Sequence, residues 1–188
     1  MSKKLKTGEA GTSLKGLRER IDTLDEKIQA LISERAHLAV AVAETKQRTG
    51  ENNFYRPERE AEVLRKALER NRGPLSNEEI LRLFREIMSA CLAQQEPLKV
   101  AFLGPEGTFT QQAVLKHFGH SVRALALPSI EEVFHEVESG AADFGVVPIE
   151  NSSEGTVNIH TLDMFLTSPL KVCGEIELRI HQHLMGRM

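Results

Sequence analysis

The hydrophobic residues of the first half of the chain recur at helical spacing. Between Leu14 and about Arg48 they return every three or four positions, which places them in one stripe along a single amphipathic helix. At ~1.5 Å per residue this helix is about 50 Å long, which is longer than a small domain is wide. We therefore expect the stripe to pack against another chain or against two further helices. It consists of Leu14, Leu17, Ile21, Leu24, Ile28, Leu31, Leu38 and Val42.

Two shorter helices are predicted after a polar break. Pro57 suits the first turn of a second helix that runs to about Arg70. Ser76, followed three positions later by Glu79, is a capping box that begins a third helix. Two short helices cannot bury the stripe of the long one. We therefore expect an all-α domain of three helices over residues 12–96 that forms a homodimer.

The second half changes to an alternation of strands and helices. Hydrophobic runs of strand length are separated by short helical segments, which predicts an α/β lobe with a mostly parallel sheet over residues 98–188. Thr108 and Ser129 can cap two of the helices. The expected strands are 98–103, 122–127, 143–149 and 172–180; a loop is expected at 150–155 and a third helix near 157–166.

Composition narrows the function classes. The 188 residues suit one large domain or two small ones, and a net charge of −3 argues against a general binder of nucleic acid or membrane surfaces. Tyr55 is the only Tyr and Trp is absent, so aromatic platforms for nucleic acid are lacking. The polar N-terminal residues resemble neither a signal peptide nor a membrane segment. Cys91 and Cys173 lie in apolar segments without metal spacing, which predicts buried thiols in a cytoplasmic protein.

Three cations on the long helix are candidates for anion binding. Arg35 and Lys46 are eleven positions apart, so they share a helix face within roughly 20° and could hold one small anion between them. Arg18 is turned roughly 100° away from that face and would serve another site. Spacing alone leaves open a solvated, salt-bridged helix face instead.

Two further positions add polar groups of the same kind. Arg59 and Glu60 lie near the start of the second helix, where they could bind a carboxylate or a hydroxyl group by charge-assisted hydrogen bonds. Gln95 lies at the end of the third helix. Each of these positions by itself is weak evidence for a binding site, since ordinary surface charge or an exposed helix end explains it equally well. Taken together with the three cations, these positions form a set that is stronger evidence for a binding site than any of them alone.

The motifs that contain this set resemble two known families. The first half resembles the all-helical chorismate mutases, and the second half resembles prephenate dehydratase. Their order is that of the bifunctional chorismate mutase–prephenate dehydratases of phenylalanine biosynthesis. The mutase motifs are 17–25, 34–35, 43–46, 59–60 and 94–95, and the dehydratase motifs are 104–110 and 145–152.

The resemblance to chorismate mutases implies a shared active site. The implied dimer is intertwined, with each long helix crossing into the partner. Arg35 and Lys46 would face the site of their own subunit, and Arg18 would reach the partner's site. Lys46, Gln95 and Arg35 would be catalytic, with no metal or cofactor, because the substrate chorismate rearranges in a unimolecular step. The substrate-binding set implied is Arg18, Arg35, Lys46, Arg56, Arg59, Glu60, Cys91 and Gln95. Of these, Arg56 and Cys91 depart from the family pattern, which has Asp and Ser there.

The resemblance to prephenate dehydratase covers about one lobe of that enzyme. The family has two α/β lobes of periplasmic-binding-protein type with prephenate between them, and a Thr-Arg-Phe motif in the second lobe. Because no such motif occurs here, we expect a truncated and inactive dehydratase half, with the two halves folding independently. The candidates for prephenate binding are Thr108, Glu150, Asn151 and Ser152, although this loop could instead only close a turn.

A function of another class stays open from the sequence. The chain could be a non-catalytic ligand-binding or regulatory module that dimerises through its helices. A bare dimerisation helix does not need Arg18, Arg35 or Lys46, so their presence favours the enzyme.

Overall fold

The computed structural model describes residues 13–50, 55–151, 155–156, 159–181 and 186. The chain divides into two compact units, Met1–Gly50 and Glu51–Met188. Each unit is described by itself. No helix in the described part of the chain is long and apolar enough to cross a membrane.

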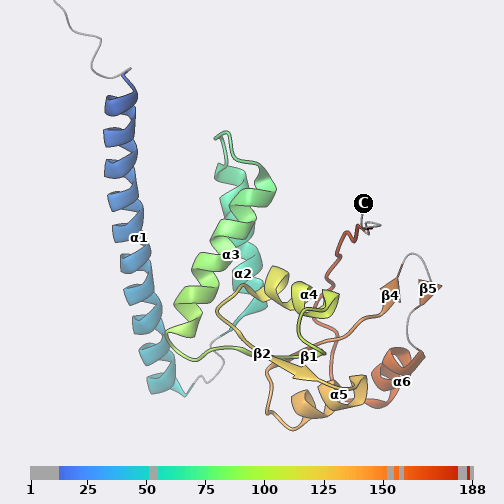
Figure 1. Cartoon of the computed structure of the whole chain (residues 1–188). Coiled ribbons are helices and arrows are strands. Elements are labelled where there is room, and N and C mark those ends of the chain that lie inside the picture. Colours follow the sequence, from blue (N-terminus) through green and yellow to red (C-terminus); the bar gives the residue numbers. More distant parts are fainter. Residues whose placement is uncertain (1–12, 51–54, 152–154, 157–158, 182–185, 187–188) are drawn as a thin grey trace, which may run out of the picture. The chain divides into compact units, whose positions relative to one another are not determined.

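The described part of the first unit consists of one unbroken helix, α1 (Leu14–Thr49), with a residue on either side of it (Figure 1). The Ser13 hydroxyl accepts a hydrogen bond from the Gly16 amide at 3.1 Å, which caps the start of the helix. Gly50 ends it in the left-handed conformation at φ 75°, which glycine adopts without steric cost. The predicted helix is confirmed. Its apolar stripe is exposed along its length, with Leu14 at 65% and Leu31 at 63%.

The second unit begins with the helices α2 (Pro57–Arg70) and α3 (Asn77–Ala93), which lie side by side (Figure 1). The Asn71 side chain bridges the turn between them by donating to the Leu75 carbonyl at 3.1 Å and to Asn77 Oδ1 at 2.9 Å. The Ser76 hydroxyl caps α3 by accepting from the Glu79 amide at 3.2 Å. The predicted end of the second helix and the predicted start of the third are therefore confirmed.

The α/β part of this unit has a three-stranded parallel sheet with β1 (Lys99–Leu103) in the middle. Its neighbours are β2 (Arg123–Leu127) and β3 (Phe144–Val146), in the order β2-β1-β3. Parallel neighbours need crossover connections, and here these are α4 (Phe109–Phe118) and α5 (Ile130–Glu138). The prediction of an all-α region followed by a mostly parallel α/β lobe is confirmed.

Side chains of the central strand alternate between two cores. Val100 and Phe102 are fully buried against Val114 of α4. Ala101 points to the opposite face, where it packs with Val133 of α5. Since successive side chains of a strand point to opposite faces, α4 and α5 cover opposite sides of the sheet. A central strand buried on both faces explains the continuous hydrophobic run in the sequence.

The segment after β3 differs from the prediction of a simple loop. Two short strands, β4 (Glu150–Asn151) and β5 (Gly155–Thr156), pair antiparallel. Strands of two residues have no periodicity, so the sequence pattern could not reveal them. The helix α6 (Ile159–Thr167) follows, close to its predicted place.

The predicted strand at 172–180 is wrong. Residues 168–181 contain neither helix nor strand, and Val172 is 69% exposed. Lys116 of α4 donates from Nζ to the Glu177 carbonyl at 2.8 Å, a contact made by a side chain instead of a neighbouring strand. A strand-like pattern forms a strand only where another strand's edge is available for pairing. Cys173 is exposed as well, so its predicted burial is wrong, whereas Cys91 is buried as expected.

The helical and α/β parts of the second unit share a core. Tyr55 and Leu92 pack against the cluster that contains Val100 and Phe118. The Tyr55 ring lies 5.3 Å from the Phe144 ring, edge to face. This shared packing argues against the expected independence of the two halves. The boundary near residues 96–98 stays a prediction.

Candidate active-site residues

The three candidate cations Arg18, Arg35 and Lys46 all lie on α1. Because α1 is continuous, the rotation between them is the one that helical geometry gives: Arg35 and Lys46 share a face, and Arg18 is turned away. The predicted anion site requires Arg35 and Lys46 to lie on one face of the same helix, and a continuous α1 places them there.

The start of α2 gives its predicted residues different surroundings. Arg56 is the N-cap residue, and its carbonyl accepts from the Arg59 and Glu60 amides at 3.0 and 3.1 Å. Arg59 forms an ion pair with Glu62 at 2.6 Å, on the exposed side of the helix. Hydrogen bonds from Lys66 and Arg59 lower the pKa of Glu62 to about 2.

Glu60 faces the interior, unlike its neighbour Arg59. Its carboxylate lies 3.7 Å from Nε of Arg85 on α3, and the two side chains are only 16% and 22% exposed. Burial raises the pKa of Tyr55, and the charge of Glu60 and a hydrogen bond to it raise this pKa further. The structure therefore joins Glu60 to Arg85 and Tyr55, two residues without any signal in the sequence, because their partner lies on a different element.

The end of α3 holds the last two mutase candidates. Cys91 is buried at 4% exposure. Gln95 lies two positions past the last helical residue, Ala93, and its backbone amide donates to the Leu92 carbonyl at 2.9 Å. Their predicted roles toward substrate stay predictions.

One of the candidate residues for prephenate binding, Thr108, already makes a hydrogen bond within its own turn. Thr108 caps α4 by accepting from the Gln111 amide at 3.4 Å, and the Gly107 amide donates to Gln111 Oε1 at 2.6 Å. These groups close the turn, which favours the structural alternative for this motif. Glu150 is exposed on β4, and Asn151 is its neighbour there. Ser152 lies outside the described residues.

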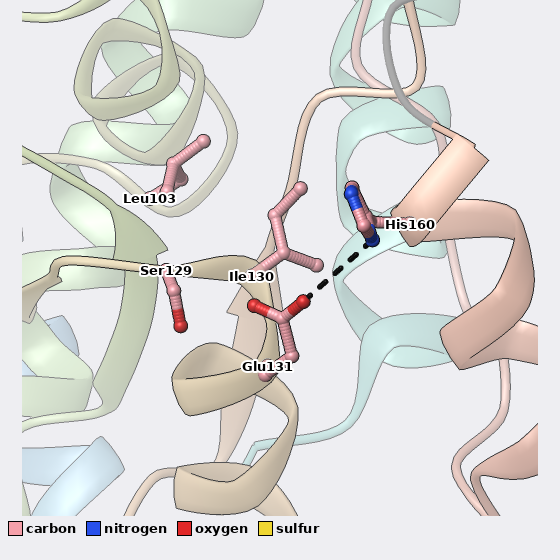
Figure 2. A pocket seen from close by; sticks show the side chains of 5 residues that line it. All are labelled: Leu103, Ser129, Ile130, Glu131 and His160. Atoms are coloured by element: carbon pink, nitrogen blue, oxygen red, sulfur yellow. Dashed lines mark ion pairs between the residues drawn. The ribbon is translucent and has the colours of Figure 1, made fainter.

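A pocket of about 290 Å³ lies at the carboxyl end of β1 (Figure 2). Figure 2 shows the Glu131 carboxylate directed toward Nδ1 of His160, at 3.9 Å. The backbone amide of Glu131 and the Ser129 hydroxyl lower the pKa of Glu131, so the pocket carries a carboxylate at neutral pH. The lining residues are Leu103, Ser129, Ile130, Glu131 and His160.

Sequence reasoning missed this pocket, although one signal was present. Ligands of parallel sheets bind beyond the carboxyl ends of the strands, and Ser129 was predicted to begin a helix directly after β2. Thr108 and Glu150 do not line the pocket. The negative charge of the Glu131 carboxylate in this pocket would repel an anion such as prephenate. Among the described residues, no group of three or more His, Cys, Asp or Glu is placed to hold a metal ion.

Comparison with known proteins finds two protein families that match different parts of the chain. Residues 17–96 match the family model of chorismate mutase type II, and residues 100–188 match that of prephenate dehydratase. A solved chorismate mutase of Thermus thermophilus (form II) is 34% identical, with a TM-score of 0.43, covering 44% of this chain and 93% of that chain.

Full-length relatives define the family more closely. A bifunctional chorismate mutase/prephenate dehydratase of Pseudomonas aeruginosa is 62% identical over 176 residues, which cover 92% of this chain and 48% of the relative. The protein of that description in Neisseria gonorrhoeae is 51% identical, covering 90% of this chain and 46% of the relative. In Escherichia coli K12 the identity is 33%, covering 92% of this chain and 48% of the relative. The chain is therefore similar over most of its length to bifunctional chorismate mutase/prephenate dehydratases, and it spans about half the length of the curated relatives it matches.

Proposed function

We propose that this chain is a chorismate mutase that rearranges chorismate to prephenate. The observation that carries the proposal is the match of residues 17–96 to chorismate mutase type II. The placement of Arg18, Arg35 and Lys46 on one continuous helix supports it, because a helix that served only for dimerisation would not need them.

The residue types suit the chemistry. The rearrangement is unimolecular, so the protein needs to hold a dicarboxylate in its compact reactive conformer and to stabilise charge that grows on the breaking ether oxygen. Arg35 and Arg18 offer guanidinium groups that match carboxylates. Lys46 and Gln95 would donate hydrogen bonds to the ether oxygen. One such donor typically contributes roughly 3–4 kcal/mol to transition-state stabilisation.

We propose that the active form is a homodimer in the cytoplasm. The exposed stripe of α1 supports the dimer, since a long row of exposed Leu and Ile side chains on one helix favours association. In this proposal Arg18 serves the partner's site. The cytoplasmic location rests on the two cysteines, Cys91 and Cys173, which are both free thiols as expected in a reducing compartment.

A continuous assay of chorismate loss with product analysis tests the function. We expect prephenate to accumulate without phenylpyruvate at neutral pH, because the 188-residue polypeptide lacks the Thr-Arg-Phe motif. Lys46→Ala should lower kcat by about 100-fold or more, the effect expected when one donor to developing charge is removed. Arg48→Ala, two positions away on α1, is the control and should keep full activity. Chorismate that binds but does not react would instead favour the non-catalytic module.

A further inference from the structure

The Glu60 carboxylate faces Arg85 inside the second unit, and its charge also acts on Tyr55 and His117 from two other segments. Arg85 comes from α3, with its Nε 3.7 Å from a Glu60 oxygen. Tyr55 precedes α2, and burial raises its pKa, with the charge of Glu60 and hydrogen bonding to Glu60 raising this pKa further. His117 comes from α4, and burial lowers its pKa. The charge of Glu60 raises this pKa, and the charge of Arg85 lowers it. Glu60 is thus the centre of a polar cluster that joins the helical and α/β parts.

Arg85 faces the Glu60 carboxylate through its buried Nε. Its Nε is buried and has no hydrogen-bond partner among the described residues, because 3.7 Å is too long for a hydrogen bond. A buried N–H group without a partner is unfavourable, so the pair favours any small shift that brings the carboxylate closer. The cation therefore restricts where the Glu60 carboxylate can lie.

Neighbouring cations of the same helices do not share this environment. Arg82, about one turn before Arg85 on α3, binds Glu79 at 2.7 Å with 64% of its side chain exposed. Arg59, next to Glu60, binds Glu62 at the surface. Of these three arginines, Arg85 is the one directed to the Glu60 carboxylate, so its position is specific to this cluster.

We propose that Arg85 is a positioning residue for the mutase reaction, which acts by holding the Glu60 carboxylate in place for a hydroxyl group of the substrate. This inference rests on the proposed function, because it assigns Glu60 a role toward chorismate. Arg85 itself does not contact substrate. A misplacement of the carboxylate by about 1 Å is enough to lower the rate by as much as 100-fold.

Kinetics of four variants test the proposal. Arg85→Met keeps the side-chain volume and removes the charge; we expect kcat to fall by about 10–100-fold with little change in KM, because orientation rather than binding is lost. Arg85→Lys keeps the charge and should recover part of kcat. Arg82→Met is the matched control on α3 and should behave as wild type. In a Glu60→Gln background, Arg85→Met should cause no further loss, because both changes act on the same carboxylate.

Each result decides between the alternatives. If wild type rearranges chorismate but Arg85→Met keeps full kcat, or if the losses of Arg85→Met and Glu60→Gln multiply, the positioning role is wrong while the proposed function stands. If wild type does not act on chorismate, the proposed function fails and this inference fails with it. If Arg85→Met does not fold, as judged by circular dichroism, Arg85→Lys decides alone. A lowered kcat that causes no further loss in the Glu60→Gln background supports the role. A kcat equal to that of Arg82→Met, or a loss that remains in the Glu60→Gln background, overturns it.

Discussion

Gly119 shows how a single residue fixes the contact between α3 and α4. Its φ is 81°, a value that residues with a side chain rarely adopt, and it directly follows α4. A Cβ atom at this position would lie 2.6 Å from Cβ of Ser89 on α3. The Ser89 hydroxyl also accepts from the Ser121 amide at 3.3 Å. The close approach of the two segments therefore requires glycine here.

Gly119→Ala should destabilise the second unit by about 2–4 kcal/mol, since backbone strain and a steric clash act together. Gly107→Ala is the matched control: its φ is 82°, but nothing lies within 4 Å of the added Cβ, so it should lose only about 1 kcal/mol. Denaturant unfolding followed by fluorescence of Tyr55, the only Tyr in a chain without Trp, measures both. Equal losses in the two variants would contradict the clash.

At the scale of elements, α3 and α4 are connected by an acid-sensitive contact. The Glu86 carboxylate accepts from the His120 amide at 3.1 Å and lies 2.7 Å from its ring Nδ1. Burial raises the pKa of Glu86, but the hydrogen bonds and charge of His120 outweigh it, so the pKa is lowered overall. Ionised Glu86 thus stabilises the folded state.

The contribution of Glu86 should disappear in acid. A carboxyl group whose pKa is lower in the folded state stabilises above its unfolded pKa, about 4.5, and loses this effect as pH falls through the folded pKa. We expect Glu86→Gln to be less stable than wild type by about 0.5–1 kcal/mol at pH 6, a modest value because the side chain is 36% exposed. The difference should shrink toward pH 3. Glu96→Gln, at an exposed position beyond α3, is the control. A difference that does not change between pH 6 and pH 3 would contradict this role.

At the scale of the whole molecule, the stripe of α1 is a row of exposed hydrophobic side chains in the described part of the chain. A row of large hydrophobic side chains on a helix of 36 residues is unfavourable in water. Association of two copies would bury it. In the proposed dimer, each site would then take Arg35 from one subunit and Arg18 from the other.

Subunit mixing measures this arrangement directly. Arg18→Ala and Arg35→Ala proteins should each be nearly inactive alone. After equal amounts are refolded together, half of the dimers are mixed, and in each mixed dimer one of two sites carries both defects and the other carries neither. Activity should therefore return to about one quarter of wild type. Proven mixed dimers without any recovery would place both arginines in the same subunit's site.

The sequence by itself determined the local features of this protein. Ser76, Thr108 and Ser129 were predicted as helix caps, and each accepts the expected backbone hydrogen bond, because capping depends on residues three positions apart. The spacing of Arg35 and Lys46 also follows from the helix alone. The central strand was predictable because burial on both faces leaves a continuous hydrophobic run.

Only the tertiary structure decided what depends on distant partners. The segment 172–180 has a strand pattern, yet it forms no strand in the described chain, since pairing requires a neighbouring edge that no local pattern reveals. Arg59 and Glu60 were indistinguishable in the sequence, but one lies at the surface with Glu62 and the other faces Arg85 on α3. The direction of a side chain relative to other elements is set by packing between segments far apart in the chain, which is why the Glu60 cluster became visible only in the folded unit.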